Sequence, residues 1–181
     1  MSPETERAFD GYLVVLAQGG SRDAMDRLVR RWTAKLVRYV SRTTGNSQSA
    51  RDIVQETWIA AIRALPRLAD SSQFPAWIYA IAHRKTVDSI RKTQRSRRLI
   101  EHAQRELEEA AAPNESEAVE QRADLSAAIA RLSEEQRAVV HLFYGEDLSV
   151  HEIATVLAVP VGTVKSRLFH ARTTLRHHLG E

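Results

Sequence analysis

The chain has 181 residues, of which 43% are apolar, and a net charge of +3. This length allows one domain or two small ones, and the lack of cysteine excludes a disulfide framework and a thiolate metal site. No apolar run approaches the roughly 20 residues that span a bilayer, and the amino terminus lacks the basic-then-apolar order of a signal peptide. We therefore expect a cytoplasmic protein without direct membrane insertion.

The first two predicted elements are helices, because the sequence shows no sustained alternation of apolar and polar residues. One helix is expected from about Pro3 to Ala17 and ends at Gly19 and Gly20. A second helix is capped by Ser21 and stops before Gly45.

The third predicted helix, about Ser49 to Leu65, has two different faces. At 100° per residue, an apolar stripe lies opposite a stripe of amide, carboxylate, apolar and guanidinium groups. The apolar stripe contains Val54, Trp58, Ala61 and Leu65 and is bordered by Ile62, and the opposite stripe contains Asp52, Gln55, Glu56, Ile59 and Arg63. The second stripe is either an ordinary solvated face with one exposed isoleucine or a surface that docks on a protein partner.

A fourth helix follows the polar loop Arg67 to Gln73 and opens at Phe74-Pro75. It has apolar residues on two sides, so it either has apolar contacts on both sides or changes its packing partner midway along its axis. Its basic end, Arg84 to Arg98, is opposed locally by Asp88 alone. That end is either a solvated helix terminus or a phosphate-binding surface, and the number of basic residues favours phosphate.

Residues 99–124 are acidic, rich in alanine and interrupted by Pro113-Asn114. With few large apolar side chains to bury, they are predicted to form a flexible linker that is helical in places. This linker divides the chain into two compact units, residues 1–98 and 125–181.

The second unit ends in a predicted helix-turn-helix. Two capping boxes, Ser133 with Gln136 and Ser149 with Glu152, mark helix starts. The helix after Ser149 is broken over residues 158–161, where Pro160 supplies the stop, and the last helix begins near Gly162 or Thr163. A short helix, a tight turn and a longer basic helix are typical of a motif that enters the DNA major groove.

The last helix carries an unusual exposed face. An apolar stripe of Val164, Leu168, Ala171, Leu175 and Leu179 lies opposite Lys165, Ser166, Phe169 and Thr173. The ring of Phe169 either packs on a neighbouring element or contacts base edges such as a thymine methyl group. No Asp or Glu occurs between Leu157 and Gly180, which favours an anionic partner.

Three segments in this order and spacing resemble bacterial sigma factors of the extracytoplasmic function type, over nearly the whole chain. They are D-I-V-Q-E-T-W-I-A-A-I-R-A-L at 52–65, F-P-A-W-I-Y-A-I-A-H-R-K-T-V-D-S-I-R-K at 74–92, and S-V-H-E-I-A-T-V-L-A-V-P-V-G-T-V-K-S-R-L-F-H-A-R at 149–172. The resemblance implies an all-α fold. It would comprise a region 2 helical bundle at 1–98, a linker at 99–124 and a region 4 helix-turn-helix domain at 125–181.

The resemblance also implies the partners and the residues that meet them. The partners would be core RNA polymerase, through its β′ clamp helices and β flap, promoter DNA and an anti-sigma factor. Polymerase would contact Asp52, Gln55, Glu56, Ile59 and Arg63. The −10 element would contact Trp77, Arg84, Lys85, Asp88, Arg91, Lys92 and Arg95, with a flipped-out base held at loop Arg67 to Gln73. The −35 element would contact Thr163, Lys165, Ser166, Arg167, Phe169, His170 and Arg172.

A protein of this kind would direct promoter-specific transcription initiation in a stress or envelope response. It would have no catalytic residue, metal, cofactor or small-molecule substrate. Three positions depart from the family pattern: Arg84 stands where Asn is usual, Ala158 where the turn often has Gly, and His170 where Arg is common. The first puts −10 recognition at that position in doubt, the second predicts a strained turn, and the third predicts an altered −35 preference.

Two other classes of protein remain as alternatives. One is a dimeric helix-turn-helix repressor or activator, whose first half would sense a ligand or form the dimer. The other is a helical hydrolase, for which the seven histidines would have to supply the chemistry. These histidines are scattered and lack the spacing of metal ligands.

Overall fold

Polar caps set the limits of the first three helices in the computed structural model, which describes residues 2–105, 128–129 and 131–179. Helix α1 covers Pro3–Gln18, α2 covers Arg22–Thr44 and α3 covers Ser47–Ala64. Ser21 caps α2, as predicted. Helix α3 begins two residues before its predicted start, because the Asn46 side chain accepts hydrogen bonds from the N–H groups of Gln48 and Ser49.

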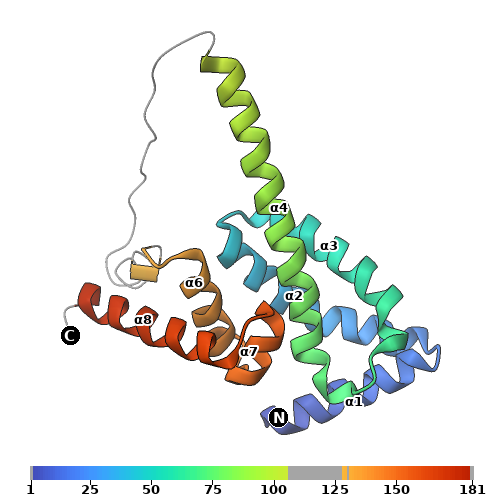
Figure 1. Ribbon diagram of the computed structural model, residues 1–181. Helices are drawn as coiled ribbons and strands as arrows, with labels where there is room; N and C mark the ends of the chain where they lie inside the picture. Colours follow the sequence, from blue (N-terminus) through green and yellow to red (C-terminus); the bar gives the residue numbers. More distant parts are fainter. Residues whose placement is uncertain (1, 106–127, 130, 180–181) are drawn as a thin grey trace.

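Helix α4, Phe74–Arg105, is the longest described element and contacts helices of both halves of the chain. It follows two short 3₁₀ turns, Leu65–Arg67 and Ser71–Gln73. In Figure 1 it crosses the bundle and then projects beyond it. Helix α4 thus continues into the segment predicted as linker, residues 99–124, and the rest of that segment, from residue 106 on, lies outside the described residues.

The C-terminal part contains α6 at Glu134–Val140, a π-helical turn at His141–Gly145, α7 at Val150–Leu157 and α8 at Val161–Leu179. Both predicted capping boxes are present. The turn of the helix-turn-helix differs from its prediction. The chain leaves α7 at Ala158, which adopts the left-handed conformation with φ 53°. The carbonyl of Pro160 then accepts the first hydrogen bonds of α8, so Pro160 starts the second helix and does not end the first.

One continuous core runs through both halves of the chain. It extends from Trp32, Tyr39 and Tyr79 of the N-terminal bundle to Leu142 and Ile153 of the C-terminal part. Helix α7 packs directly against α4. The two predicted units are therefore packed together, and α4 contacts α3 of the first and α7 of the second. Among the residues that the structure describes, no helix has the length and apolar character of a membrane span.

Candidate nucleic-acid and protein interfaces

The polar face of α3 is fully turned to solvent. Its five predicted residues, Asp52, Gln55, Glu56, Ile59 and Arg63, are all exposed, whereas Val54 and Trp58 on the opposite face are buried. Ile62, which the sequence placed at the border of the buried stripe, is instead 48% exposed, close to the 47% of Ile59. Two exposed isoleucines among polar groups are unusual for a plain solvated face and favour a docking surface.

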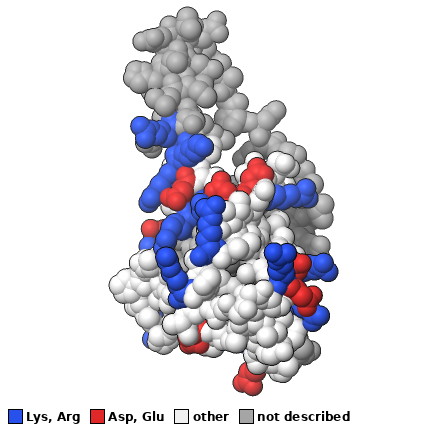
Figure 2. Space-filling model, turned by 90° about the vertical axis from the view of Figure 1, so that its right-hand side faces the viewer, with Lys and Arg blue, Asp and Glu red and all other residues white. Residues whose placement is uncertain are grey.

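The basic stripe of α4 is also accessible. Arg84, Asp88, Arg91, Lys92 and Arg95 are exposed, and Lys85 is half-buried beside Glu56, with 3.2 Å between Nζ and the carboxylate. In Figure 2, basic side chains gather toward the end of the molecule from which α4 projects in Figure 1, with acidic side chains beside them. This arrangement provides cations in reach of a phosphate backbone.

Trp77 belongs to the same stripe by helical spacing, but it lies differently. Its side chain is half-buried, and its ring centroid lies 5.9 Å from that of Phe74. The ring therefore presents only part of its surface to a ligand, and its other contacts belong to the bundle.

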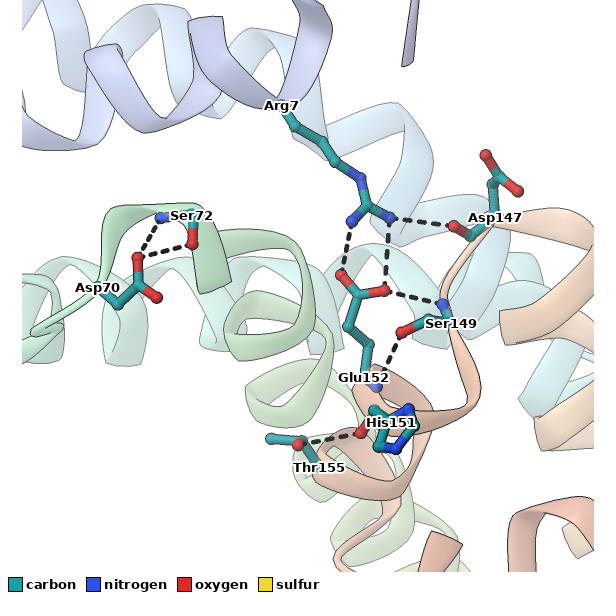
Figure 3. A network of polar contacts seen from close by, with 8 residues as sticks. All are labelled: Arg7, Asp70, Ser72, Asp147, Ser149, His151, Glu152 and Thr155. Carbon is teal, nitrogen blue, oxygen red and sulfur yellow. Dashed lines mark hydrogen bonds and ion pairs between the residues drawn. The ribbon is translucent and has the colours of Figure 1, made fainter. Parts of the chain in front are cut away.

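The loop before α4 is shaped by Asp70. Its carboxylate accepts hydrogen bonds from the backbone N–H of Ser72 at 2.9 Å and from the Ser72 hydroxyl at 2.6 Å (Figure 3). These bonds hold the pKa of Asp70 below its ordinary value. The loop borders a hollow of about 440 Å³, which α1 lines with Arg7 and Tyr12. The loop is thus a fixed edge of an open hollow.

The face of α8 opposite its apolar stripe is exposed, as helical spacing predicts. Lys165, Ser166, Phe169 and His170 are exposed, and Phe169 is 67% exposed. The ring of Phe169 lies edge-on to that of His170, with 5.5 Å between the centroids. Of the two alternatives for Phe169, packing on a neighbouring element is therefore wrong, and an apolar contact with a ligand remains.

Two arginines predicted on this face have protein partners. Arg167 is only 21% exposed and pairs with Glu135 at 2.8 Å, so it faces α6 and not the reading face. The Nε of Arg172 donates to the hydroxyl of Tyr144 at 2.8 Å, and its guanidinium lies over the rings of Tyr144 and Phe143. Thr163 is half-buried in the first turn of α8.

Tyr144, which the sequence does not single out, lies in the π-helical turn His141–Gly145. It is 60% exposed. Its contact with Arg172 orients that cation at the edge of the helix-turn-helix. The sequence carries no clear signal for the π-helical turn that contains Tyr144.

Two histidines lie wholly or partly inside the protein: His141 is buried and His83 is half-buried. Burial and the neighbouring Arg42 and Arg137 lower the pKa of His141 to about 4. Burial, and secondarily Arg167, lowers the pKa of His83, whose Nδ1 lies 2.9 Å from the Tyr39 hydroxyl. No group of three or more potential metal ligands occurs within the described ranges.

Comparisons with known proteins agree with this geometry. The chain matches the models of Sigma-70 region 2 at residues 28–96 and of Sigma-70 region 4 at residues 122–175. It is 33% identical to the RNA polymerase sigma-H factor of Pseudomonas aeruginosa, over 92% of this chain and 91% of the relative. It is 36% identical to the ECF RNA polymerase sigma factor SigL of Mycobacterium tuberculosis, over 82% and 84%.

Solved structures show the same fold. CnrH, in complex with the cytosolic domain of CnrY, is 25% identical and gives a TM-score of 0.68, covering 95% of this chain and 97% of CnrH. The sigma factor RpoE of Bartonella quintana, in complex with the anti-sigma factor NepR, gives 0.68 at 22% identity, covering 86% and 96%. With both sigma regions present in the predicted order, the chain belongs to the extracytoplasmic function (ECF) family of RNA polymerase sigma factors.

Proposed function

We propose that this chain is a promoter-specificity subunit, which binds bacterial core RNA polymerase and directs initiation by reading a −10 and a −35 element. One observation carries the proposal. Three chemically different surfaces are exposed on three separate helices: the mixed face of α3, the basic stripe of α4 and the Phe169 face of α8. A dimeric repressor needs only the last of these. The chain acts with the polymerase and is not itself a catalyst.

The α3 face is assigned to the polymerase. Ile59 and Ile62 supply apolar area, while Gln55 and Glu56 supply hydrogen-bonding and charged groups around it. An apolar centre with a polar rim is the usual composition of a protein interface. Its partner would be the β′ clamp helices, and the C-terminal domain would meet the β flap.

The α4 stripe and the preceding loop are assigned to the −10 element. Arg84, Arg91 and Arg95 contact the backbone, and the Asp88 carboxylate is an acceptor for a base amino group. A base taken out of the stack costs a few kcal/mol, which contacts at loop 67–73 have to offset.

The α8 face is assigned to the −35 element. Lys165 and His170 provide polar contacts to bases or phosphates, and Phe169 provides an apolar contact with a thymine methyl group. Arg172, held by Tyr144, contacts a phosphate at the edge of the motif. Arg167 takes part only if its pair with Glu135 opens.

An anti-sigma factor is assigned as the regulator. The two structural neighbours above were each solved in a complex, CnrH with the cytosolic domain of CnrY and RpoE with the anti-sigma factor NepR. By analogy, this chain is held inactive in the cytoplasm by an anti-sigma factor and released in a stress or envelope response.

Run-off transcription with purified core polymerase and fragmented genomic DNA tests the function. The protein should give discrete transcripts that core polymerase alone does not give. A matched variant, Gln55→Ala with Glu56→Ala, should fold normally and give fewer transcripts, because both side chains are exposed. A repressor would give no transcript from core enzyme, and that result would exclude the proposal.

A further inference from the structure

Helix α1 packs on the loop that precedes α4, although it lies outside the residues that match the family model. The Sigma-70 region 2 match covers residues 28–96, whereas α1 ends at Gln18. The helix contacts both 3₁₀ turns of the loop, Leu65–Arg67 and Ser71–Gln73. An element outside the matched region therefore supports the loop that is assigned to the −10 element.

Gln18 holds the first part of this loop, residues 65–68. Its side-chain Nε2 donates to the carbonyl of Leu65 at 2.9 Å and to the carbonyl of Leu68 at 2.8 Å. The amide nitrogen carries two hydrogens, so these two bonds use its full capacity as a donor. Because the two carbonyls lie three residues apart, one side chain of α1 sets the path of the chain between them.

Gly11 lets α1 come close to the second part of the loop, residues 70–73. A methyl group at Gly11 would lie 3.4 Å from Oγ and 3.7 Å from the carbonyl oxygen of Ser71. A methyl group would therefore just fit, and a larger side chain would displace the loop. The Asp70 carboxylate braces the same part through its bonds to Ser72. Both parts of the loop are thus held in place, the first by Gln18 and the second by Asp70 and the close packing on α1.

The hollow of about 440 Å³ lies between α1 and the second part of the loop. Tyr12 and Val15, which are 59% and 56% exposed and one helical turn apart, line it from α1. Ser71, Ser72 and Gln73 line it from the loop with hydroxyl and amide groups. An aromatic ring combined with such polar groups suits a flat base, which stacks by its face and forms hydrogen bonds by its edge.

The charges around the hollow also favour a base over a phosphate. The charged residues on its lining are Arg7 and Glu152, which pair with each other, with 2.8 Å between Nη1 and Oε1 (Figure 3). The positive charge of the guanidinium is therefore already balanced, and the Asp70 carboxylate of the same loop adds a negative charge. A phosphate would gain little in this hollow, whereas a neutral base is not repelled.

We propose that α1 is part of the −10 pocket: the Tyr12 ring stacks on the base that leaves the DNA stack, and Gln18 holds the loop whose polar groups meet the edge of that base. Tyr12 is a binding residue, and Gln18 is a positioning residue. This assignment rests on the proposed function, which puts a flipped-out base at loop 67–73. It makes the N-terminal helix, together with α4, a determinant of which base is preferred in the −10 element.

A double-mutant cycle between protein and DNA tests the contact of Tyr12 with a base. Holoenzyme binding is measured on single-stranded oligonucleotides that carry the −10 sequence of a run-off promoter, with an abasic site placed at each position in turn. Tyr12→Ala should weaken binding to the intact oligonucleotide about 5- to 150-fold, the usual range for a lost base–aromatic stack. With the abasic site at one particular position, the parent and Tyr12→Ala should bind equally, because the stacked base is absent for both.

Two variants of α1 serve as matched controls. Tyr12→Phe keeps the ring and should bind like the parent protein. Leu16→Ala removes an exposed apolar side chain of the same helix that does not line the hollow, and it should also bind like the parent. Thermal melting should show that Tyr12→Ala is folded, since its side chain is largely exposed.

Gln18→Ala and Gln18→Glu test the positioning role. Both lack the two N–H donors, and Gln18→Glu keeps the length of the side chain. At the position identified with Tyr12→Ala, each should reduce the preference of the holoenzyme for the promoter base over the other three bases about five- to tenfold. A residue that only stabilised the fold would lower the affinity for all four bases alike, so an unchanged preference would refute the positioning role.

The outcomes separate this proposal from the function on which it rests. If the parent holoenzyme binds the oligonucleotides and transcribes, but the effect of Tyr12→Ala is the same with and without every base, α1 has no part in the pocket and the sigma function stands. If the parent holoenzyme neither binds the oligonucleotides nor transcribes, the proposed function is refuted and this proposal falls with it.

Discussion

Replacing Phe169 with alanine should separate DNA recognition from stability. The Phe169 side chain is 67% exposed, so about a third of its surface is buried in the free protein. That is roughly 60 Å² of a side chain of about 200 Å², which at about 25 cal/mol per Å² gives an upper bound near 1.5 kcal/mol. Alanine is the better helix former by about 0.5 kcal/mol. We therefore expect Phe169→Ala to change the free energy of unfolding by about 1 kcal/mol or less.

The adjacent Leu168 is the matched control. It is 4% exposed on the buried stripe, so Leu168→Ala should cost about 2–5 kcal/mol and lower the melting temperature by several degrees.

Promoter affinity is expected to respond mainly to Phe169. On DNA the exposed two-thirds of the ring can be buried, and a lost apolar base contact of this kind is worth about 1–3 kcal/mol, or roughly 5- to 150-fold in affinity. The assay is a pair of measurements, thermal melting of the free protein and holoenzyme binding to a promoter taken from the run-off products. This reasoning would be refuted if the melting temperature of Phe169→Ala were as low as that of Leu168→Ala. It would also be refuted if Phe169→Ala left the promoter affinity unchanged.

Three further predictions concern other parts of the chain. Gln55→Ala with Glu56→Ala should change the free energy of unfolding by no more than about 0.5 kcal/mol, but should weaken core polymerase binding about tenfold in a competition assay. Unchanged affinity for polymerase would contradict the assignment of the α3 face. Ala158→Gly should raise stability by about 0.5–1 kcal/mol in a denaturant titration, because φ is 53° there, and a loss would mean that the methyl group packs. The pKa of His141 is lowered to about 4 in the folded protein. As the pH falls, this histidine therefore takes up a proton in the unfolded chain at a higher pH than in the folded protein, which favours unfolding. Stability should be full above about pH 6.5 and fall toward pH 4, and His141→Asn should flatten the melting curve against pH in that window.

The sequence predicted the elements well where capping and periodicity act locally. Ser21, Ser133 and Ser149 start helices because each side chain accepts a nearby backbone N–H, a contact within four residues. The same holds for the exposed faces of α3 and α8, since helical spacing fixes which side chains share a side. The turn at Ala158 was expected to be strained for the same local reason.

The sequence could not predict contacts between distant segments. Helical spacing alone would place Arg167 at the border of the exposed face of α8. Its side chain instead pairs with Glu135 of α6, and helical spacing does not predict a contact with another helix. Tyr144 lies in a π-helical turn and contacts Arg172 of α8, 28 positions away in the sequence. The pairing of Arg7 with Glu152 joins residues 145 positions apart, and no local pattern encodes it. The relative placement of the two halves was likewise open from sequence.

Glu152 serves two structures with one carboxylate, since it completes the cap of α7 and binds Arg7. Substitutions of Glu152 therefore affect the cap of α7 together with the contact between α1 and α7. Arg7 has no such constraint, because it lies within α1 and its partly exposed side chain takes no part in the cap of α7. Substitution of Arg7 therefore loosens the contact between α1 and α7 but leaves the cap of α7 in place. The packing of the two halves and the start of the helix-turn-helix thus depend on different residues.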